Sequence, residues 1–176
     1  MRTLAAAVAV AVLTGPLAWG QIVQLRRPDV IYVATPQAVV EAMLRLAKVT
    51  AGDVVYDLGS GDGRIPITAA TMFGARGVGI EIDSNRIREA NDNLAKTRVG
   101  NRVTFLNQDL FTSDFSEATV VTLFLMPRVN LQLMPKLKAM RPGTRIVSHH
   151  FNMGDEWPAD ESQDVNGLMI YLWTIK

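Results

Sequence analysis

The chain has 176 residues, which is the size of one domain with a sizeable hydrophobic core. It contains no cysteine, which excludes disulfide bridges, thiolate metal sites and cysteine nucleophiles. The sequence holds 18 Lys and Arg against 17 Asp and Glu, and residues 1–20 carry one of the Arg and no acid, so residues 21–176 are neutral. A neutral domain without a basic arm gives no indication of a nucleic-acid surface.

The first twenty residues have the order of a secretory signal. Arg2 supplies a positive charge, residues 4–13 are an apolar run, and Ala18-Trp19-Gly20 offers small residues where a signal peptidase cleaves. The apolar run is too short to span a bilayer as a helix. An uncleaved anchor, with membrane association through residues 4–19, and a soluble N-terminus are the alternatives. We therefore predict an exported (periplasmic or extracellular) or membrane-anchored protein with a single domain over residues 21–176.

Helices and strands are predicted to alternate after residue 35. Thr35 is expected to cap the first helix with Pro36 at its first position, Ser84 to cap the third, and Pro135 to break or restart the fourth. The predicted strands cover residues 53–58, 77–82, 102–107, 119–126, 145–151, 161–165 and 168–175, and the other helices cover residues 64–74 and 128–140.

The last two predicted strands flank Asn166-Gly167, which is the strongest short signal for a β-hairpin. Alternating strands and helices followed by a hairpin are typical of an α/β fold. We predict a Rossmann-like, doubly wound and mostly parallel seven-stranded sheet with a C-terminal antiparallel hairpin.

A glycine loop joins the first predicted strand to the next helix. It reads Asp57-Leu-Gly59-Ser60-Gly61-Asp62-Gly63, and Glu81 ends the following strand 24 residues after Asp57. An acid at about that distance, at the end of the second strand, binds a ribose diol in nucleotide-binding folds. The motif therefore predicts a ligand that carries a ribose.

Charge distinguishes the two classes of ribose ligand. A dinucleotide brings a pyrophosphate to this loop, which Asp57 and Asp62 oppose, whereas S-adenosyl-L-methionine brings a sulfonium and an ammonium, which they attract. The spacing G-x-G-x-G also departs from the G-x-G-x-x-G of dinucleotide folds. We predict S-adenosyl-L-methionine as the cofactor, with a dinucleotide or a merely structural loop as the alternatives. The predicted donor-binding residues are Asp57, Gly59, Ser60, Gly61, Asp62, Gly63, Glu81, Ile82, Asp109 and Leu110.

Asp109 follows the third predicted strand. In this architecture the position lies beside the adenine, and a carboxylate there can accept a hydrogen bond from the exocyclic amine. The alternative is that Asp109 caps a helix over residues 110–117.

Four segments together resemble a particular family of class I, seven-strand methyltransferases. The family contains a small archaeal broad-specificity protein-lysine methyltransferase and the mitochondrial enzymes that methylate lysines of the adenine nucleotide translocase and the ATP synthase c-subunit. The resemblance extends over residues 36–176 and implies lysine methylation, which no spacing shows. The segments are Tyr32-Val-Ala-Thr-Pro36, Val55-Tyr-Asp-Leu-Gly-Ser-Gly-Asp-Gly-Arg-Ile65, Glu117-Ala-Thr-Val-Val-Thr-Leu-Phe-Leu125 and Pro142-Gly-Thr-Arg-Ile-Val-Ser-His149.

The acceptor side of the site is less clear. Many amine methyltransferases carry Asn/Asp-Pro-Pro-Tyr/Phe after the fourth strand, where this chain has Phe124-Leu-Met-Pro127. Tyr32 and His149 are the candidate catalytic residues, although alignment of the acceptor with an activated donor suffices for methyl transfer. Tyr32 is predicted either to fold over the donor as part of a lid or to pin the lead-in segment to the core.

Two further groups of residues have simpler interpretations. His149 and His150 are neighbours on a strand and point to opposite faces, so no metal site is predicted. An acidic stretch is interpreted as a solvated loop, with attraction of basic substrate segments as the alternative. It comprises Asp155, Glu156, Asp160, Glu161 and Asp164.

The sequence thus predicts an S-adenosylmethionine-dependent methyltransferase that acts on lysine side chains of protein partners and binds no nucleic acid. A small-molecule or lipid methyltransferase and a non-catalytic donor-binding module are the alternatives.

Overall fold

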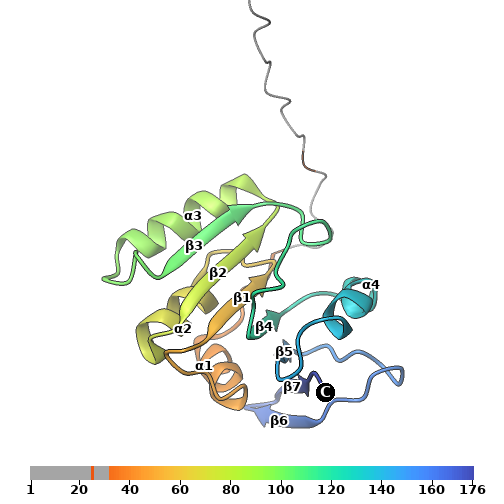
Figure 1. Cartoon of the computed structure of the whole chain (residues 1–176). Coiled ribbons are helices and arrows are strands. Elements are labelled where there is room, and N and C mark those ends of the chain that lie inside the picture. The colour runs from red at the N-terminus through yellow and green to blue at the C-terminus, as the bar shows by residue number, and fades with distance from the viewer. Residues whose placement is uncertain (1–24, 26–31) are drawn as a thin grey trace, which may run out of the picture.

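The computed structural model describes residue 25 and residues 32–176 (Figure 1), so the predicted export or anchoring segment lies outside the described residues. The helices are α1 (Gln37–Leu46), α2 (Arg64–Phe73), α3 (Ser84–Ala95) and α4 (Pro127–Lys138). The strands are β1 (Val54–Leu58), β2 (Arg76–Glu81), β3 (Val103–Asn107), β4 (Val120–Leu123), β5 (Arg145–His149), β6 (Glu161–Val165) and β7 (Leu168–Thr174).

One seven-stranded sheet forms the centre of the molecule, in the order β3-β2-β1-β4-β5-β7-β6. Strands β1 to β5 pair in parallel, and β7 runs antiparallel to both β5 and β6. Asn166 and Gly167 both have positive φ, as the predicted two-residue hairpin turn requires. The predicted fold class and the C-terminal hairpin are confirmed.

Alternate residues of the strands face two separate cores. Tyr56 and Leu58 of β1 belong to the core beneath α4, while Val55 belongs to the core beneath α1 and α2. Helices α1, α2 and α3 therefore cover one face of the sheet and α4 the other (Figure 1). This doubly wound arrangement brings the carboxyl ends of the parallel strands to one edge, where ligands bind in such sheets.

Irregular segments complete the layer that contains α4. Residues 108–119, between β3 and β4, contain no helix, so the helix over 110–117 considered as an alternative for Asp109 does not form. Phe115 of this segment is 1% exposed, and Met153 of the segment after β5 is fully buried. These apolar side chains fill the face of the sheet in place of helices.

The first helix begins differently from the prediction. Its N-cap is Pro36, with no side-chain cap hydrogen bond, so the prediction of Thr35 as N-cap is wrong. The Thr35 hydroxyl instead lies 3.2 Å from His149 Nδ1, 114 residues along the chain. A tertiary contact with a distant side chain is present in place of the local cap.

Two other local predictions are also wrong. The N-cap of α3 is Asp83, whose side chain accepts from Asn85 N, and Ser84 is the first helical residue. Helix α4 continues through Pro135 without a break. Pro135 is exposed, so the backbone hydrogen bond that it lacks lies on the solvent side, while the buried face of α4 stays packed on the sheet. Among the described residues, no helix is both long and apolar enough to cross a membrane.

Candidate active site

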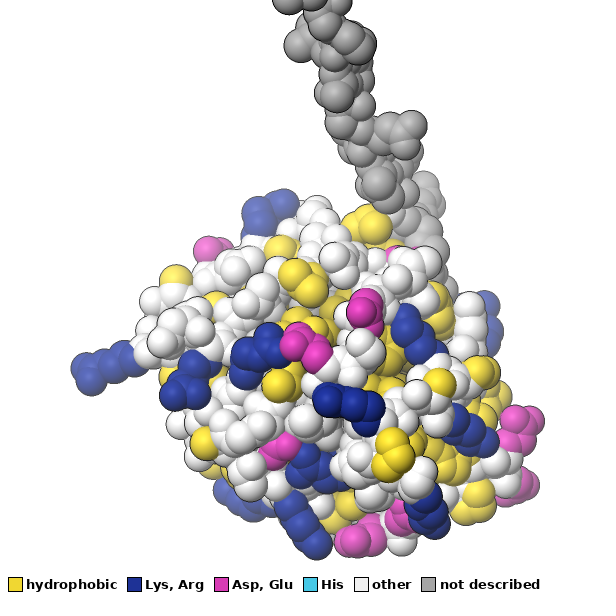
Figure 2. All heavy atoms as spheres, viewed as in Figure 1, with side chains coloured by type: hydrophobic (Ala, Val, Ile, Leu, Met, Phe, Trp, Pro, Cys, Tyr) yellow, Lys and Arg dark blue, Asp and Glu magenta, His cyan; other side chains and the backbone are white. Residues whose placement is uncertain are grey.

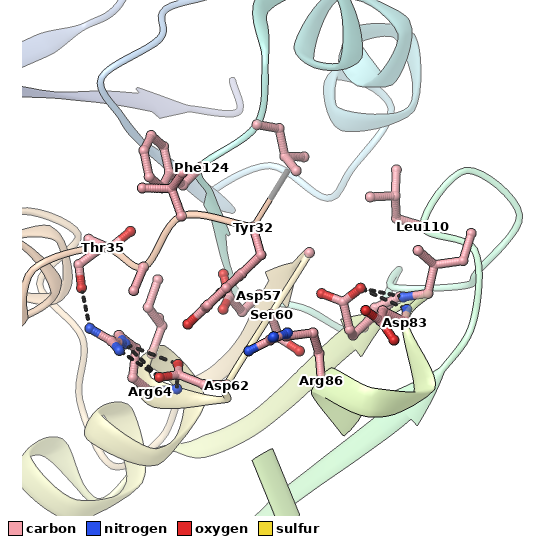
Figure 3. Close-up of a pocket in the computed structure, with 18 of the residues that line it drawn as sticks. Tyr32, Thr35, Asp57, Ser60, Asp62, Arg64, Asp83, Arg86, Leu110 and Phe124 are labelled. Atoms are coloured by element: carbon pink, nitrogen blue, oxygen red, sulfur yellow. Dashed lines mark hydrogen bonds and ion pairs between the residues drawn. The ribbon is translucent and has the colours of Figure 1, made fainter. Parts of the chain in front are cut away.

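A cleft lies at the carboxyl ends of β1, β2 and β4 (Figure 3). From β1 the chain first adds β2 and β3 on one side of the sheet and then adds β4 and β5 on the other. The boundary between β1 and β4 is therefore the switch point, where open α/β sheets bind ligands. Its empty volume is about 1000 Å³, part of it open to solvent. The predicted donor-binding residues that line it are Asp57, Gly59, Ser60, Asp62, Glu81, Ile82, Asp109 and Leu110.

The other two predicted donor residues, Gly61 and Gly63, shape the loop that borders the cleft. Gly61 has a φ of 52°, and a Cβ placed there would lie 2.1 Å from Cε2 of Tyr32. A side chain at this position would therefore meet both backbone strain and a direct clash. The bare backbone of Gly61 is what allows the Tyr32 ring to lie against the loop.

Glu81 holds the loop and the end of β2 together. One carboxylate oxygen accepts from Gly61 N at 2.9 Å, and the other accepts from Ile82 N at 2.8 Å and Asp83 N at 2.9 Å. A carboxylate has about four acceptor positions, so capacity for a ribose hydroxyl remains. The prediction that Glu81 ends the second strand beside the glycine loop is confirmed; its contact with ribose stays a prediction.

Asp57 is buried beneath the loop at 3% exposure. The Thr122 hydroxyl donates to its Oδ1 at 2.6 Å. Burial disfavours the charged carboxylate and raises its pKa to about 7, with Glu81 and Asp62 adding to the rise and the Thr122 bond opposing it. A cationic ligand group arriving above Asp57 would stabilise the charged form.

Asp62 is paired with Arg64, a residue that the sequence reasoning missed. Arg64 Nη2 lies 2.6 Å from Oδ2, Arg64 Nε donates to both carboxylate oxygens, and Nη1 donates to the Thr35 carbonyl at 2.8 Å. Burial by itself would raise the pKa of Asp62, but the hydrogen bonds and charge of Arg64 hold it below its usual range. The only sequence signal was the position of Arg64 directly after the last glycine of the motif.

Asp109 lines the cleft and also stabilises its own turn. Its Oδ1 accepts from Phe111 N at 2.9 Å, and its carbonyl accepts from Ser113. Asp109 therefore caps a turn rather than a helix. Its proposed contact with adenine is compatible with this position at the end of β3 and stays a prediction.

Tyr32 borders the cleft from the lead-in segment before α1. The guanidinium of Arg86 lies 4.6 Å from the centre of its ring, and the residue is 37% exposed. Burial and the nearby Asp62 raise the pKa of its hydroxyl. Of the two interpretations of Tyr32, a cover over the glycine loop agrees with its position better than an anchor in the hydrophobic core.

His149 lies behind the cleft rather than in its lining. It is 3% exposed, its ring centre lies 4.1 Å from that of Phe124, and Phe124 does line the cleft. Its Nε2 has no hydrogen-bond partner among the described residues, and burial lowers the pKa of the imidazole to about 4. His149 is thus a neutral side chain that supports Phe124 and, through Thr35, the lead-in segment.

The two histidines lie in different surroundings. His150 is exposed with a φ of 67°, and its ring contacts Phe151 edge-on. Among residues 32–176, no group of three His, Cys, Asp or Glu side chains is placed to hold a metal ion.

The buried state of His149 predicts a pH-dependent stability. Because the pKa is about 4 in the folded protein and 6.5 as a model value, the unfolded chain binds more protons between these values. Stability is therefore lost as the pH falls from 6.5 to 4, by up to about 3 kcal/mol. The difference in free energy of unfolding between wild type and His149→Gln measures this loss. A Met72→Ala control, at an exposed residue that does not titrate, should show no such pH dependence. A flat difference for His149→Gln would contradict the assignment.

Comparison with known proteins shows the family of the chain. Residues 57–161 match the ANTKMT methyltransferase domain. The chain belongs to this methyltransferase family. It is 48% identical to a protein-lysine N-methyltransferase of Saccharolobus islandicus (strain REY15A) over 84% of this chain and 95% of that one. It is 35% identical to the mouse adenine nucleotide translocase lysine N-methyltransferase over 71% of this chain but only 55% of that enzyme.

A solved structure supports the same assignment. A Salinibacter ruber protein described as an RNA methyltransferase, in complex with S-adenosyl-L-homocysteine, superimposes with a TM-score of 0.79. The two chains are 53% identical, and the match covers 81% of this chain and 94% of that one. The chain is an S-adenosylmethionine-dependent methyltransferase, as the glycine loop and the two carboxylates predicted.

The residues of the cleft fit this cofactor. Ser60 Oγ lines the cleft and is a buried polar atom without a hydrogen-bond partner among the described residues. An unpaired hydroxyl in a lining of this kind is satisfied when a polar ligand binds. Glu81, Asp109 and Asp57 all line the cleft, and they remain the predicted partners of the ribose, the adenine and the ammonium.

Proposed function

We propose that this protein transfers methyl groups to lysine side chains of proteins. The observation that carries the proposal is the almost end-to-end match to an archaeal enzyme named for that activity. The acceptor side of the cleft is consistent with it. Phe124, Leu125 and Val129 line this side of the cleft and make an apolar wall. The aliphatic part of a lysine side chain packs well on such a wall.

The chemistry asks little of the protein beyond placement. When bound, the donor supplies a methyl group already activated by a sulfonium. The neutral lysine nitrogen forms the new N–C bond as the S–C bond breaks, and that bonding pair stays with sulfur as a thioether. The lysine must first release its proton to solvent, which desolvation against Phe124 favours by lowering the lysine pKa. His149 is not required as a base, because it is buried and has no contact with the cleft.

RNA is the second candidate acceptor, because the Salinibacter ruber relative is described as an RNA methyltransferase. Charge favours protein over RNA. Residues 21–176 carry no net charge, and on the face shown in Figure 2 the Lys and Arg side chains are scattered among acidic and neutral ones. Binding of RNA without a basic surface would forgo the phosphate contacts that dominate such affinity.

The test is to offer both acceptors at once. The purified 176-residue chain is incubated with methyl-deuterated donor, a protein extract and total RNA, followed by mass spectrometry of peptides and nucleosides. We expect heavy methyl groups on lysine. Label confined to nucleosides would replace lysine with RNA as the acceptor. Absence of label from both, with donor binding retained by calorimetry, would replace it with a small molecule, a lipid or a non-catalytic role.

The apolar wall makes a separate prediction. We expect Phe124→Ala to lower kcat/KM for the protein acceptor by about 10- to 100-fold, because the acceptor loses aromatic packing worth about 1–3 kcal/mol. The dissociation constant of the donor should change much less. The control is Met72→Ala, an exposed apolar residue on α2 outside the cleft. An equal loss of donor affinity and acceptor turnover would show that Phe124 does not contact the acceptor.

We also propose that residues 1–20 export the domain or anchor it in a membrane. The support is the order of charge, apolar run and small residues in the sequence. A reporter enzyme that is active only outside the cytoplasm, fused after residue 25, should be active. An inactive reporter in a stably expressed fusion would remove the proposal.

A further inference from the structure

The backbone directly after β5 takes a conformation that side chains rarely adopt. Within the described part of the chain, three residues other than glycine have positive φ, namely Lys48, His150 and Asn166. Lys48 follows α1 in a Schellman motif, in which its N–H donates to the Arg45 carbonyl, and Asn166 occupies the hairpin turn. Positive φ is ordinary in both of these motifs. His150 belongs to neither of them.

His150 is the central residue of a three-residue turn. Its φ is 67°, and Phe151 N donates to the His149 carbonyl at 2.8 Å. A positive φ together with this hydrogen bond is the geometry of the rare and strained form of the γ-turn. Such strain persists only where the surrounding structure holds it, and it is concentrated at functional sites.

Hydrogen bonds from three elements hold this turn. The Ser148 hydroxyl of β5 donates to the Phe151 carbonyl at 2.6 Å, and Asn130 Nδ2 of α4 donates to the same oxygen at 3.4 Å. Ser148 and Asn130 are both fully buried. His150 N donates to the Met169 carbonyl of β7 at 2.7 Å. The fold therefore imposes a strained backbone on His150, which a glycine at this position would adopt without that cost.

The turn adds two aromatic rings to Phe124. The rings of Phe124 and Phe151 are stacked, with 21° between their planes and 6.3 Å between their centres. The His150 ring meets Phe151 edge-on, with 4.6 Å between the centres. Phe124 lines the cleft, Phe151 is partly buried and His150 is exposed. The three rings form an aromatic strip that leads from the cleft to the surface.

The aromatic strip lies away from the predicted adenosine end of the cleft. Glu81 ends β2 and Asp109 follows β3, on one side of β1, whereas the strip follows β4 and β5 on the other side. Figure 3 likewise shows Phe124 apart from Asp83 and Leu110. An acceptor that approaches the methyl group from the side opposite to adenosine therefore passes along the strip.

The dimensions of the aromatic strip suit a lysine side chain. The five single bonds from Cα to Nζ, each about 1.5 Å long, give an extended length of about 6 Å. The ring centres of Phe124 and Phe151 are 6.3 Å apart. When the lysine nitrogen lies beside Phe124, the main chain of the acceptor therefore lies near Phe151, and His150 meets the residues next to the lysine.

We propose that the aromatic strip of Phe124, Phe151 and His150 binds the protein segment that carries the acceptor lysine, and that the His150 ring is a specificity-determining group at its outer end. The methylene groups of lysine pack along aromatic rings while the nitrogen stays free to react. A glycine at position 150 would relieve the backbone strain and lose this contact. The inference deepens the proposed lysine methylation and rests on it.

The test separates the ring of His150 from its backbone. The purified 176-residue chain receives saturating methyl-deuterated donor and a limiting amount of protein extract, and peptide mass spectrometry measures the initial rate of heavy-methyl incorporation into lysine. Under these conditions the rate is proportional to kcat/KM. We expect His150→Gly to lower it by about 3- to 10-fold. The dissociation constant of the donor should stay within twofold, and the urea midpoint should stay the same or rise. A merely structural role of His150 would not lower the rate at unchanged stability.

Three matched variants isolate the ring. His150→Asn, which tolerates positive φ but has no ring, should lose as much rate as His150→Gly. His150→Phe, which restores a ring, should stay within twofold of wild type at an equal concentration of folded protein. Lys48→Gly relieves a positive φ at an exposed residue outside the lining of the cleft and should leave the rate unchanged.

The outcomes distinguish this proposal from the proposed function. A His150→Gly rate equal to wild type would overturn the role of the strip while lysine methylation stands. A rate for His150→Phe as low as that for His150→Gly would overturn it as well, because a ring at this position would not be what matters. A loss of donor affinity in His150→Gly as large as the loss of rate would also overturn it. If the wild-type chain labels no lysine at all, the proposed function fails, and the acceptor role of the strip fails with it.

Discussion

Glu81→Ala is expected to weaken donor binding by more than about 100-fold. Its carboxylate accepts hydrogen bonds from the main-chain N–H groups of Gly61, Ile82 and Asp83. Glu81 also lines the part of the cleft where ribose is predicted to bind. Truncation removes the ribose acceptor and leaves the Gly61 amide of the loop unpaired. Loss of several such bonds to a charged group amounts to about 3–5 kcal/mol.

Calorimetric titration with S-adenosyl-L-homocysteine measures this loss. Glu41→Ala is the matched control, because Glu41 lies on α1 in a surface ion pair with Arg45 and should leave the affinity unchanged. Glu81→Asp, which keeps the charge on a shorter side chain, should fall between the two. A dissociation constant for Glu81→Ala within threefold of wild type would remove Glu81 from the donor site.

Asp57→Asn is expected to separate stability from function. The carboxylate is 3% exposed, and its pKa of about 7 lies above the model value of 3.8. The folded protein therefore binds more protons than the unfolded chain between these values, and the stability contributed by the protonated carboxyl is lost as the pH rises from 4 to 7. The neutral amide has no such loss. The variant should gain up to about 4 kcal/mol relative to wild type across this range.

Donor binding should change in the opposite direction. Without the carboxylate, the ammonium of the donor loses a buried charged partner, which at pH 8 should weaken binding by about 30- to 1000-fold. Urea unfolding at pH 4, 6 and 8 and calorimetry at pH 8 measure the two effects. Asp92→Asn, on the exposed side of α3, is the control for both. A donor affinity within threefold of wild type would mean that Asp57 shapes the site without binding the ammonium.

The local patterns of the sequence were sufficient to predict the fold and the class of ligand that the donor side of the site binds. Apolar runs predicted the first five strands, and Asn166-Gly167 predicted the hairpin of the last two. Glu81, at its distance from Asp57, predicted a ribose ligand, and Asp57 with Asp62 predicted that this ligand is positively charged. These features depend on neighbouring residues, on period and on chemical type, all of which are visible in a linear chain. Caps were less predictable, because a capping side chain competes with partners that the sequence does not show. Thr35 contacts His149 instead of capping α1.

The remainder of the site depends on contacts between distant segments. Burial under the loop and the hydroxyl of Thr122, 65 residues away, determine the charge state of Asp57. Arg64 lines the cleft and donates to the Thr35 carbonyl, 29 residues away, and neither contact was visible in the sequence. His149 was a candidate catalytic residue in the sequence, and the structure places it behind Phe124. The sequence by itself determined which chemical groups this protein has, and the tertiary structure decided which of them face the donor, because solvent exposure and long-range partners exist only after the chain has folded.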